Sequence, residues 1–156
     1  MALILANGCF DVFHEGHSNF LFRAKMLGTN WNGTYWATND KFITQLGTPN
    51  KLVVCVNSDE SARCLKLVKW GERYPIDDHF TRMANVAKYA DITLGFDTEE
   101  QLHGIIEKYS PCIIVKGPDY AGKPVTGDDI APVLILDTPE PEAVKQMKRE
   151  VYGNDR

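Results

Sequence analysis

Short apolar runs alternate with amphipathic helical patterns along the chain, and this alternation constrains the fold more than any other feature. Runs that are apolar at almost every position suit strands buried on both faces of a parallel sheet. Strands that alternate with helices predict an α/β fold with right-handed crossovers and helices on both faces. The strands are expected at residues 2–7, 52–56, 92–94, 112–115 and 133–136, and the helices from about residue 17, after residues 57–60, and over residues 77–89, 99–109 and 139–152.

The length of the chain, 156 residues, fits one domain with one core, which we place over residues 1–156. A single Rossmann-like, doubly wound parallel sheet of about five strands, in the order 3-2-1-4-5, would put the first and fourth strands side by side where the order reverses. Ligands bind at such a point, outside the carboxyl ends of the strands. The loops that leave these two strands begin at Gly8 and Gly117, so the topology predicts a binding site between them.

Two segments depart from the regular alternation. Residues 29–50 are rich in Asn, Thr and Gly, include Trp31 and Trp36, and are longer than the usual connection between a helix and a strand. We interpret them as an insertion that forms a lid, a flap or an oligomer contact. Residues 66–73 are basic and are expected to form an irregular loop whose end is marked by Pro75.

The charge balance argues against several classes of partner. The formal net charge is −4, from 17 basic and 21 acidic residues, and no basic stripe of the kind that binds nucleic acid is present. No apolar run is long enough to span a bilayer, and the N-terminus lacks the basic start of a signal peptide. The four cysteines form no CxxC pair and are expected to be reduced. We therefore expect a cytoplasmic protein without nucleic-acid or membrane partners.

Residues 8–17, with the sequence GCFDVFHEGH, carry the residue types that the first loop of such a site needs. Gly8 follows the first strand, where the backbone turns tightly and a ligand can approach closely. His14 and His17 are three residues apart, so both imidazoles can face one ligand if His17 lies in the first turn of a helix. The amide donors and the dipole of a helix N-terminus favour a phosphate there. Gly16 lies between the two histidines and leaves room for a flat base.

This segment resembles the G-x-F-D-x-x-H-x-G-H signature of the cytidylyltransferase-like nucleotidyltransferases. Other stretches resemble the nucleotidyltransferase domain of bacterial ADP-heptose synthases and, more distantly, glycerol-3-phosphate cytidylyltransferase. These stretches are residues 56–59 (Val-Asn-Ser-Asp), Leu65-Lys66, Arg73-Tyr74-Pro75, Arg82-Met83 and residues 115–120 (Val-Lys-Gly-Pro-Asp-Tyr). The resemblance covers roughly residues 1–28 and 51–137 and leaves the insertion without a counterpart.

The resemblance implies a reaction in which a substrate phosphate attacks the α-phosphorus of ATP or CTP in line and pyrophosphate leaves. Mg²⁺ is expected to accompany the triphosphate, without a protein metal site. The implied acceptor is a phosphorylated small molecule, either a sugar phosphate such as a heptose 1-phosphate with ATP or a polyol phosphate with CTP. Dimers are common among similar proteins, so a homodimer is among the expectations.

The resemblance also assigns roles to individual residues. His14, His17 and Lys66 are the expected catalytic residues, which stabilise charge around the reacting phosphates. Asp11 is expected to orient the loop that carries His14. Contacts to the nucleotide are expected from Gly8, Phe10, Asp11, Gly16, Lys116, Gly117, Asp119 and Tyr120. Lys69, Arg73 and Arg82 are candidates for the acceptor's phosphate or the pyrophosphate, and Arg82 is the best placed of the three.

Simpler interpretations stay open for several of these residues. Isolated loop histidines are more often surface residues than ligands, although the complete motif outweighs that interpretation for His14 and His17. The cations at positions 66, 69 and 73 could instead form a solvated basic loop, and Arg82 could be an ordinary helix-face arginine. A plain dinucleotide-binding domain is discounted because residues 8–17 lack the glycines of G-x-G-x-x-G.

One departure from the family pattern leaves two functional hypotheses. The family carries a Ser/Thr-rich motif at the start of its last helix, whose hydroxyls and amides bind the β- and γ-phosphates. This chain has Leu-Asp-Thr-Pro-Glu-Pro-Glu at residues 136–142, where only Thr138 offers a hydroxyl and three carboxylates would repel a triphosphate. Either another segment, such as residues 29–50, binds the pyrophosphate end in an active enzyme, or the chain is a catalytically impaired nucleotide-binding module with a regulatory or assembly role.

Overall fold

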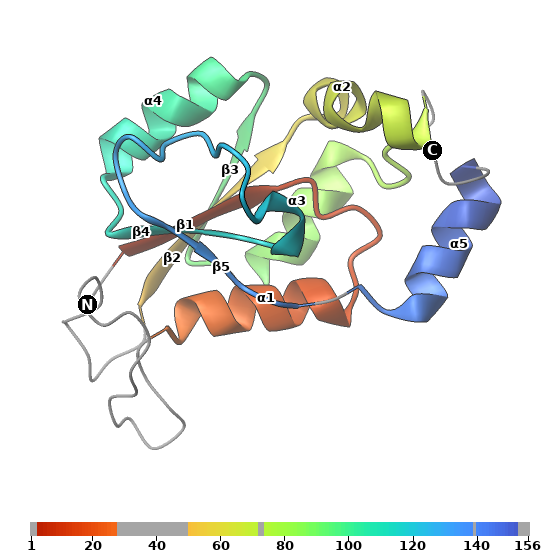
Figure 1. Ribbon diagram of the computed structural model, residues 1–156, viewed down its shortest axis with the longest axis horizontal. Coiled ribbons are helices and arrows are strands. Elements are labelled where there is room, and N and C mark those ends of the chain that lie inside the picture. The colour runs from red at the N-terminus through yellow and green to blue at the C-terminus, as the bar shows by residue number, and fades with distance from the viewer. Residues whose placement is uncertain (1–2, 28–49, 72–73, 139, 153–156) are drawn as a thin grey trace.

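A five-stranded parallel sheet forms the centre of the computed structural model, which describes residues 3–27, 50–71, 74–138 and 140–152 (Figure 1). The strand order is β3-β2-β1-β4-β5, and each neighbouring pair is parallel. The predicted α/β class and the order 3-2-1-4-5 are therefore confirmed, and the bounds of the strands differ from the expected ones by one or two residues. The strands are β1 (Leu3–Gly8), β2 (Lys51–Asn57), β3 (Ile92–Phe96), β4 (Ile113–Lys116) and β5 (Val133–Ile135).

Helices cover both faces of the sheet, as the alternation predicted. α1 (Glu15–Lys25) and α3 (His79–Ala87) pack on one face, and α4 (Glu99–Tyr109) packs on the other. α2 (Asp59–Trp70) and α5 (Glu142–Tyr152) share a small aromatic cluster at one end of the molecule (Figure 1). A short 3-10 helix, η2 (Pro118–Tyr120), follows β4. Among the described helices, none combines the length and hydropathy that a bilayer-spanning helix needs.

The pleat of the strands divides the core into two parts. Ile4 and Ala6 of β1 pack with α1 and α3, whereas Leu5 packs with α4. Val54 and Val53 of β2 divide between the two sides in the same way. Successive side chains of a strand point to opposite faces, so a strand covered on both faces must be apolar at nearly every position. This requirement explains why the continuous apolar runs predicted the central strands.

The helix α2 is longer than expected, and the prediction of an irregular loop from residue 66 was wrong as far as residue 70. Ser58 caps the helix by accepting a hydrogen bond from the backbone N–H of Ser61, and the helix buries Ala62 and Trp70. Lysine and leucine are strong helix formers, so the basic character of this stretch does not interrupt the helix. Gly71 ends it with a φ of 83°, a conformation that glycine adopts without steric cost.

The predicted insertion falls almost entirely outside the described residues, which omit 28–49. The lid, flap or oligomer contact therefore stays a prediction. Asn50, which follows this segment, donates from its backbone N–H to the Lys25 carbonyl at 3.0 Å and from Nδ2 to the Leu27 carbonyl at 2.9 Å. The chain thus enters β2 beside the point where it left α1.

Candidate active site

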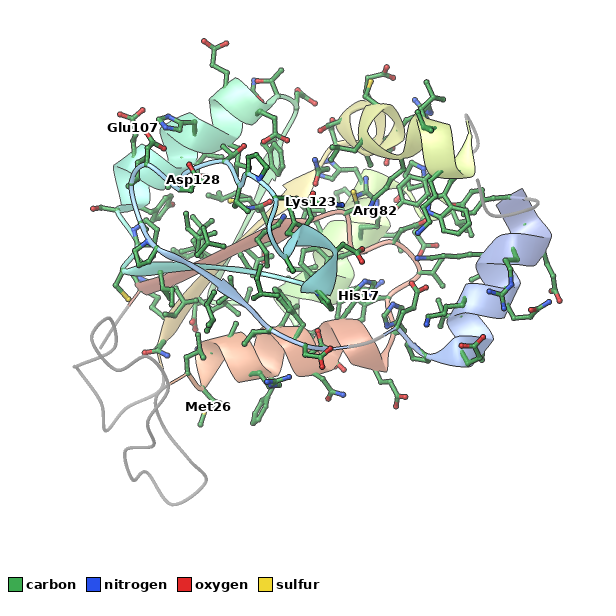
Figure 2. The ribbon with its side chains drawn as sticks, viewed as in Figure 1. His17, Met26, Arg82, Glu107, Lys123 and Asp128 are labelled. Atoms are coloured by element: carbon green, nitrogen blue, oxygen red, sulfur yellow. The ribbon has the colours of Figure 1, made fainter. Side chains whose placement is uncertain are left out.

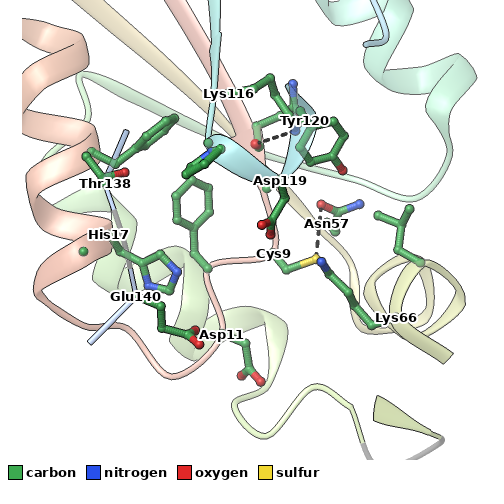
Figure 3. A pocket seen from close by; sticks show the side chains of 18 of the residues that line it. Cys9, Asp11, His17, Asn57, Lys66, Lys116, Asp119, Tyr120, Thr138 and Glu140 are labelled. Atoms are coloured by element: carbon green, nitrogen blue, oxygen red, sulfur yellow. Dashed lines mark hydrogen bonds between the residues drawn. The ribbon is translucent and has the colours of Figure 1, made fainter. Parts of the chain in front are cut away.

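A cavity of about 750 Å³ opens at the carboxyl ends of β1 and β4, where the topology predicted a site (Figure 3). The loop after β1, the start of α1 and the loop after β4 line one part of it, and α2 and α5 line another. His14, His17, Lys66 and Lys116 all line this cavity. The fold therefore brings together predicted site residues that lie far apart in the sequence.

His14 and His17 stack at the amino end of α1, with ring centroids 3.8 Å apart and 21° between the ring planes. His14 is the N-cap residue, and its Nδ1 accepts a hydrogen bond from the Gly16 backbone N–H at 3.0 Å. The Nδ1 atom of His17 accepts in turn from the His14 backbone N–H at 3.4 Å, which completes a capping box. The helix thus begins at Glu15, two residues earlier than expected, and its capping fixes both rings.

These contacts determine which ring nitrogen carries the proton. An Nδ1 atom that accepts from a backbone N–H presents its lone pair, so the proton of each neutral imidazole sits on Nε2. The Nε2 atom of His14 is buried and has no hydrogen-bond partner within the described ranges, and Glu140 Oε2 lies 3.5 Å from it. Buried polar groups are normally hydrogen-bonded, so the cavity contains a donor that a ligand's oxygen can satisfy.

The His17 ring is held neutral by its surroundings. Its desolvation, followed by the neighbouring His14, lowers the His17 pKa from 6.5 to about 3. The unfolded chain protonates this histidine below pH 6.5, whereas the folded protein does not, so the stabilisation is present above pH 6.5 and is lost as the pH falls towards 3. Between pH 7 and pH 5 we expect this group to lower the free energy of unfolding by about 2 kcal/mol.

Urea unfolding at pH 7, 6 and 5 measures the slope of the free energy of unfolding against pH. The His17→Asn variant keeps an acceptor near the position of Nδ1 and should remove most of the slope. His103→Asn is the matched control, because Asp129 raises the pKa of this surface histidine and gives its contribution the opposite sign. Loss of His103 should therefore make the slope steeper, and an unchanged slope in His17→Asn would contradict the assignment.

Phe10 and Asp11 shape the loop between β1 and α1. Phe10 has a φ of 53° and packs edge-on against His17, with ring centroids 5.4 Å apart. Asp11 is 2% exposed, and its carboxylate accepts hydrogen bonds from the backbone N–H groups of Ile76 and Asp77 at 2.9 and 2.8 Å. The hydroxyl of Tyr152, at the end of α5, donates to the same carboxylate at 3.1 Å. Asp11 therefore anchors this loop to the segment before α3 and to α5, and its contact with a nucleotide stays a prediction.

The glycines at the predicted nucleotide site differ in what surrounds them. A Cβ atom at Gly8 would lie 3.2 Å from the Phe10 ring, so this turn leaves little room for a side chain. Gly16 is buried in the capping turn, whereas a Cβ atom at Gly117 would meet open space. Gly117, Asp119 and Tyr120 all line the cavity, as a role beside a base or a ribose requires. That role stays a prediction.

Lys116 places a cationic group at the edge of the cavity, between β1 and β4. It is 4% exposed, and its ammonium donates hydrogen bonds to Asn7 O at 3.1 Å and to Asn7 Oδ1 at 2.8 Å (Figure 3). The same ammonium lies 3.9 Å from the centroid of the Tyr120 ring. Burial lowers the pKa of Lys116 from 10.5 to about 8. Lys116 thus holds the ends of the two strands together and borders the predicted nucleotide site.

The basic residues predicted from the stretch 66–73 are partly described. Lys66 and Lys69 extend from α2 and line the cavity, and Lys66 is the more buried of the two. The ammonium of Lys69 lies 4.9 Å from the Trp70 ring centroid. Arg73 lies outside the described residues, so its role stays a prediction.

Arg82 occupies a position that the sequence did not predict. It is fully buried and is not among the residues that line the cavity (Figure 2). Its guanidinium donates from Nε to the Asp77 carbonyl at 3.1 Å, from Nη1 to the Cys9 carbonyl at 2.8 Å and from Nη2 to Asp59 Oδ1 at 2.7 Å. Binding of the acceptor's phosphate by Arg82 stays a prediction, but these contacts give its guanidinium a structural role.

α5 supplies cavity residues that the sequence reasoning missed. Lys145, Lys148 and Arg149 line the cavity from one side of this helix, together with Glu140 in the segment before it. Their separation by three and four residues puts them on one helix face, and that spacing is visible in the sequence. The packing of Tyr152 against the aromatic residues of α2 and the following loop helps to direct this face toward the cavity.

The described ranges contain no group of three or more His, Cys, Asp or Glu side chains arranged to hold a metal ion. Mg²⁺ in nucleotide sites is bound by one or two carboxylates together with phosphate oxygens. The carboxylates that line the cavity, and that a cation arriving with the triphosphate could reach, belong to Asp11, Glu99, Asp119, Asp137 and Glu140. The Mg²⁺ requirement stays a prediction.

The chain is similar to curated proteins named bifunctional protein HldE. It is 35% identical to the protein of Campylobacter concisus over 130 residues, which are 82% of this chain and 22% of that protein. It is 29% identical to the protein of Campylobacter fetus over 154 residues, 97% of this chain and 28% of that protein. The chain thus spans about a quarter of the length of these relatives. HldE is an ADP-heptose synthase, so the resemblance that the motifs indicated is confirmed.

A solved structure shares the fold. The lipopolysaccharide core biosynthesis protein from Thermoplasma volcanium GSS1 matches with a TM-score of 0.58 at 20% sequence identity, covering 90% of this chain and 99% of that chain. At this identity the likeness shows the fold alone. No protein-family model matches the sequence.

Proposed function

We propose that this chain, which is similar to the cytidylyltransferase-like nucleotidyltransferases over most of its length, transfers an AMP or CMP group from a nucleoside triphosphate to a phosphorylated small molecule and releases pyrophosphate. ATP with a sugar phosphate is the first choice of substrates, and CTP with a polyol phosphate is the second. The similarity to HldE supports a nucleotidyltransferase-like function in general.

The stacked pair of His14 and His17 is the observation that carries the proposal. Both rings lie at the amino end of α1 and line the cavity, and both direct Nδ1 to a backbone N–H. Their Nε2–H groups and the positive end of the helix dipole are suited to phosphate oxygens. His14 Nε2 has no hydrogen-bond partner among the described residues, and a phosphate bound there would take the place of the Glu140 carboxylate, whose Oε2 lies 3.5 Å away.

In the proposed reaction, an oxygen of the acceptor's phosphate attacks the α-phosphorus in line and forms a new P–O bond. The bond from the α-phosphorus to the bridging oxygen breaks, and that oxygen leaves with the electron pair as part of pyrophosphate. No covalent enzyme intermediate is required, so the protein contributes positioning and charge stabilisation. His14 and His17 donate hydrogen bonds to the α-phosphate oxygens, and the Lys66 ammonium neutralises charge that develops on the leaving group.

A pyrophosphate-release assay tests this function. The protein is incubated with Mg²⁺ and each of ATP, CTP, GTP and UTP, against a panel of sugar phosphates and polyol phosphates. We expect release that requires one triphosphate and one acceptor and that is lost in His17→Ala. Release of equal rate from wild type and His17→Ala would reject the mechanism.

A catalytically impaired nucleotide-binding module is the second candidate. It is favoured by the carboxylates of Asp137 and Glu140, which line the cavity where the family carries hydroxyl groups. This candidate predicts that the protein binds a nucleoside triphosphate, detected by calorimetry, and releases no pyrophosphate with any acceptor. Robust turnover with one defined acceptor would exclude it.

A further inference from the structure

Glu140 occupies the part of the cavity that faces the histidine pair. Its Oε2 atom accepts a hydrogen bond from the Lys148 ammonium at 2.6 Å, and the same oxygen lies 3.5 Å from His14 Nε2 (Figure 3 shows Glu140 beside His17). One carboxylate oxygen thus lies between a lysine ammonium and an imidazole that the capping box orients toward the cavity. A phosphoryl oxygen is suited to the same two groups.

The surroundings of Glu140 keep it charged. The neighbouring His14, followed by Lys148, lowers the pKa of Glu140 from 4.5 to about 2. Glu140 therefore presents a permanent negative charge near neutral pH, close to the buried donor of His14. An anion other than Glu140 can take this position only if the carboxylate leaves.

Lys148 is a buried residue of the cavity wall rather than a surface lysine. It is 8% exposed, and its ammonium lies 6.0 Å from the Trp70 ring centroid. Lys145 and Arg149 flank it on α5 and line the same cavity. Among the acidic residues that the structure describes, these two form ion pairs with Glu142, at 3.8 and 3.4 Å on the exposed side, where ion pairs contribute little. Lys145 and Arg149 can therefore turn to an anion in the cavity at small cost.

We propose that Lys148, supported by Lys145 and Arg149, binds the β- and γ-phosphates of the nucleotide, and that Glu140 occupies this subsite when no nucleotide is bound. The inference rests on the proposed function, because it names the polyphosphate end of the same ligand. It assigns to side chains of α5 the role that hydroxyl groups would have at the start of this helix. Nucleotide binding then exchanges one anion for another, and Lys148 keeps a negative partner in both states.

Calorimetric titration of the full chain with inorganic pyrophosphate tests the subsite without requiring catalysis. Glu140→Gln removes the competing charge and should bind pyrophosphate about tenfold tighter than wild type, whereas Lys148→Gln should bind it about tenfold more weakly. Glu150→Gln and Lys108→Gln change the net charge equally at exposed positions away from the cavity and should stay within about twofold of wild type.

Lys148→Gln leaves Glu140 without its buried partner and is the variant at risk of unfolding, so the double variant Glu140→Gln/Lys148→Gln is measured beside it. The double variant should fold and should bind pyrophosphate at least tenfold more weakly than Glu140→Gln alone. Wild-type affinity in Lys148→Gln, or equal affinities of Glu140→Gln and the double variant, would overturn the proposal.

The outcomes separate this subsite from the proposed function. Pyrophosphate binding that depends on Lys148, in a protein that never releases pyrophosphate from any triphosphate, would keep the subsite and reject the transfer reaction. Turnover with one acceptor, combined with unaltered pyrophosphate affinity in Lys148→Gln, would keep the reaction and reject the subsite.

Discussion

Turnover of His14→Ala and of His17→Ala is expected to fall about 10³-fold relative to wild type, because removal of one pre-organised hydrogen-bond donor at a developing charge typically costs 10²- to 10³-fold. The two rings stack at 3.8 Å and share one capping box, so the loss of either also releases the other from its fixed orientation. Steady-state pyrophosphate release with the triphosphate and acceptor found in the panel assay measures the effect.

The histidines cap α1 as well as line the cavity, so the two roles must be separated. His14→Asn does this, because asparagine is a good N-cap whose side-chain oxygen can accept from the Gly16 N–H but which offers no donor at the position of Nε2. We expect wild-type thermal stability and a loss of turnover as large as in His14→Ala. His103→Ala, at a surface site on α4, is the control and should leave turnover unchanged. Near-normal turnover in His14→Asn would show that His14 acts as a cap alone.

The arrangement of the sheet could be predicted because it depends on a local pattern. A strand such as β2, covered on both faces, requires apolar residues at consecutive positions, and that requirement is visible in the sequence. The order of the strands is a common one for doubly wound parallel sheets, and its reversal beside β1 places the site between the ends of β1 and β4. The extent of α2 was missed because the basic character of residues 66–73 suggested a loop, although burial of Trp70 and the stop at Gly71 decide where the helix ends.

The candidate site was predictable where its residues lie on one short segment. His14 and His17 are three residues apart within one complete motif, and this combination indicated that they would act together. The cations of α5 carry an equally regular spacing, but their direction depends on how Tyr152 packs against Trp70 and Tyr74, which no local pattern encodes. For the same reason, Glu140 was expected only to repel a triphosphate, whereas its pairing with Lys148 is a tertiary contact.

Arg82 is a residue whose tertiary contacts the sequence also failed to predict, but here the structure moves a predicted site residue out of the cavity lining. Its place in a family motif suggested a phosphate ligand, and an isolated arginine on a helix gives no indication of burial. The structure encloses its guanidinium completely and engages Nε, Nη1 and Nη2 with three separate segments. A phosphate of a ligand would have to replace these contacts of the buried guanidinium. The free energy of unfolding of Arg82 variants therefore measures the structural role of Arg82.

Arg82→Met should lower the free energy of unfolding by about 3 kcal/mol, because it leaves the partly buried Cys9 carbonyl without its donor and removes the partner of Asp59. The Asp59 side chain is 41% exposed and can be solvated by water, which keeps the cost below that of a fully buried pair. Urea unfolding at pH 7 measures the change. Arg63→Met, which removes a surface arginine paired with Glu60 on α2, is the matched control and should cost less than about 0.5 kcal/mol.

Arg82→Lys distinguishes a structural role from a phosphate ligand. Lysine keeps the positive charge but cannot reproduce a fork that donates in three directions, so we expect it to recover less than half of the lost stability. A phosphate ligand would behave differently, because lysine binds phosphate as a point charge and would preserve much of the acceptor affinity. Wild-type stability in both variants, together with a raised KM for the acceptor, would return Arg82 to the binding site. Low stability with an unchanged KM would establish that it joins the loop after β1 to the starts of α2 and α3.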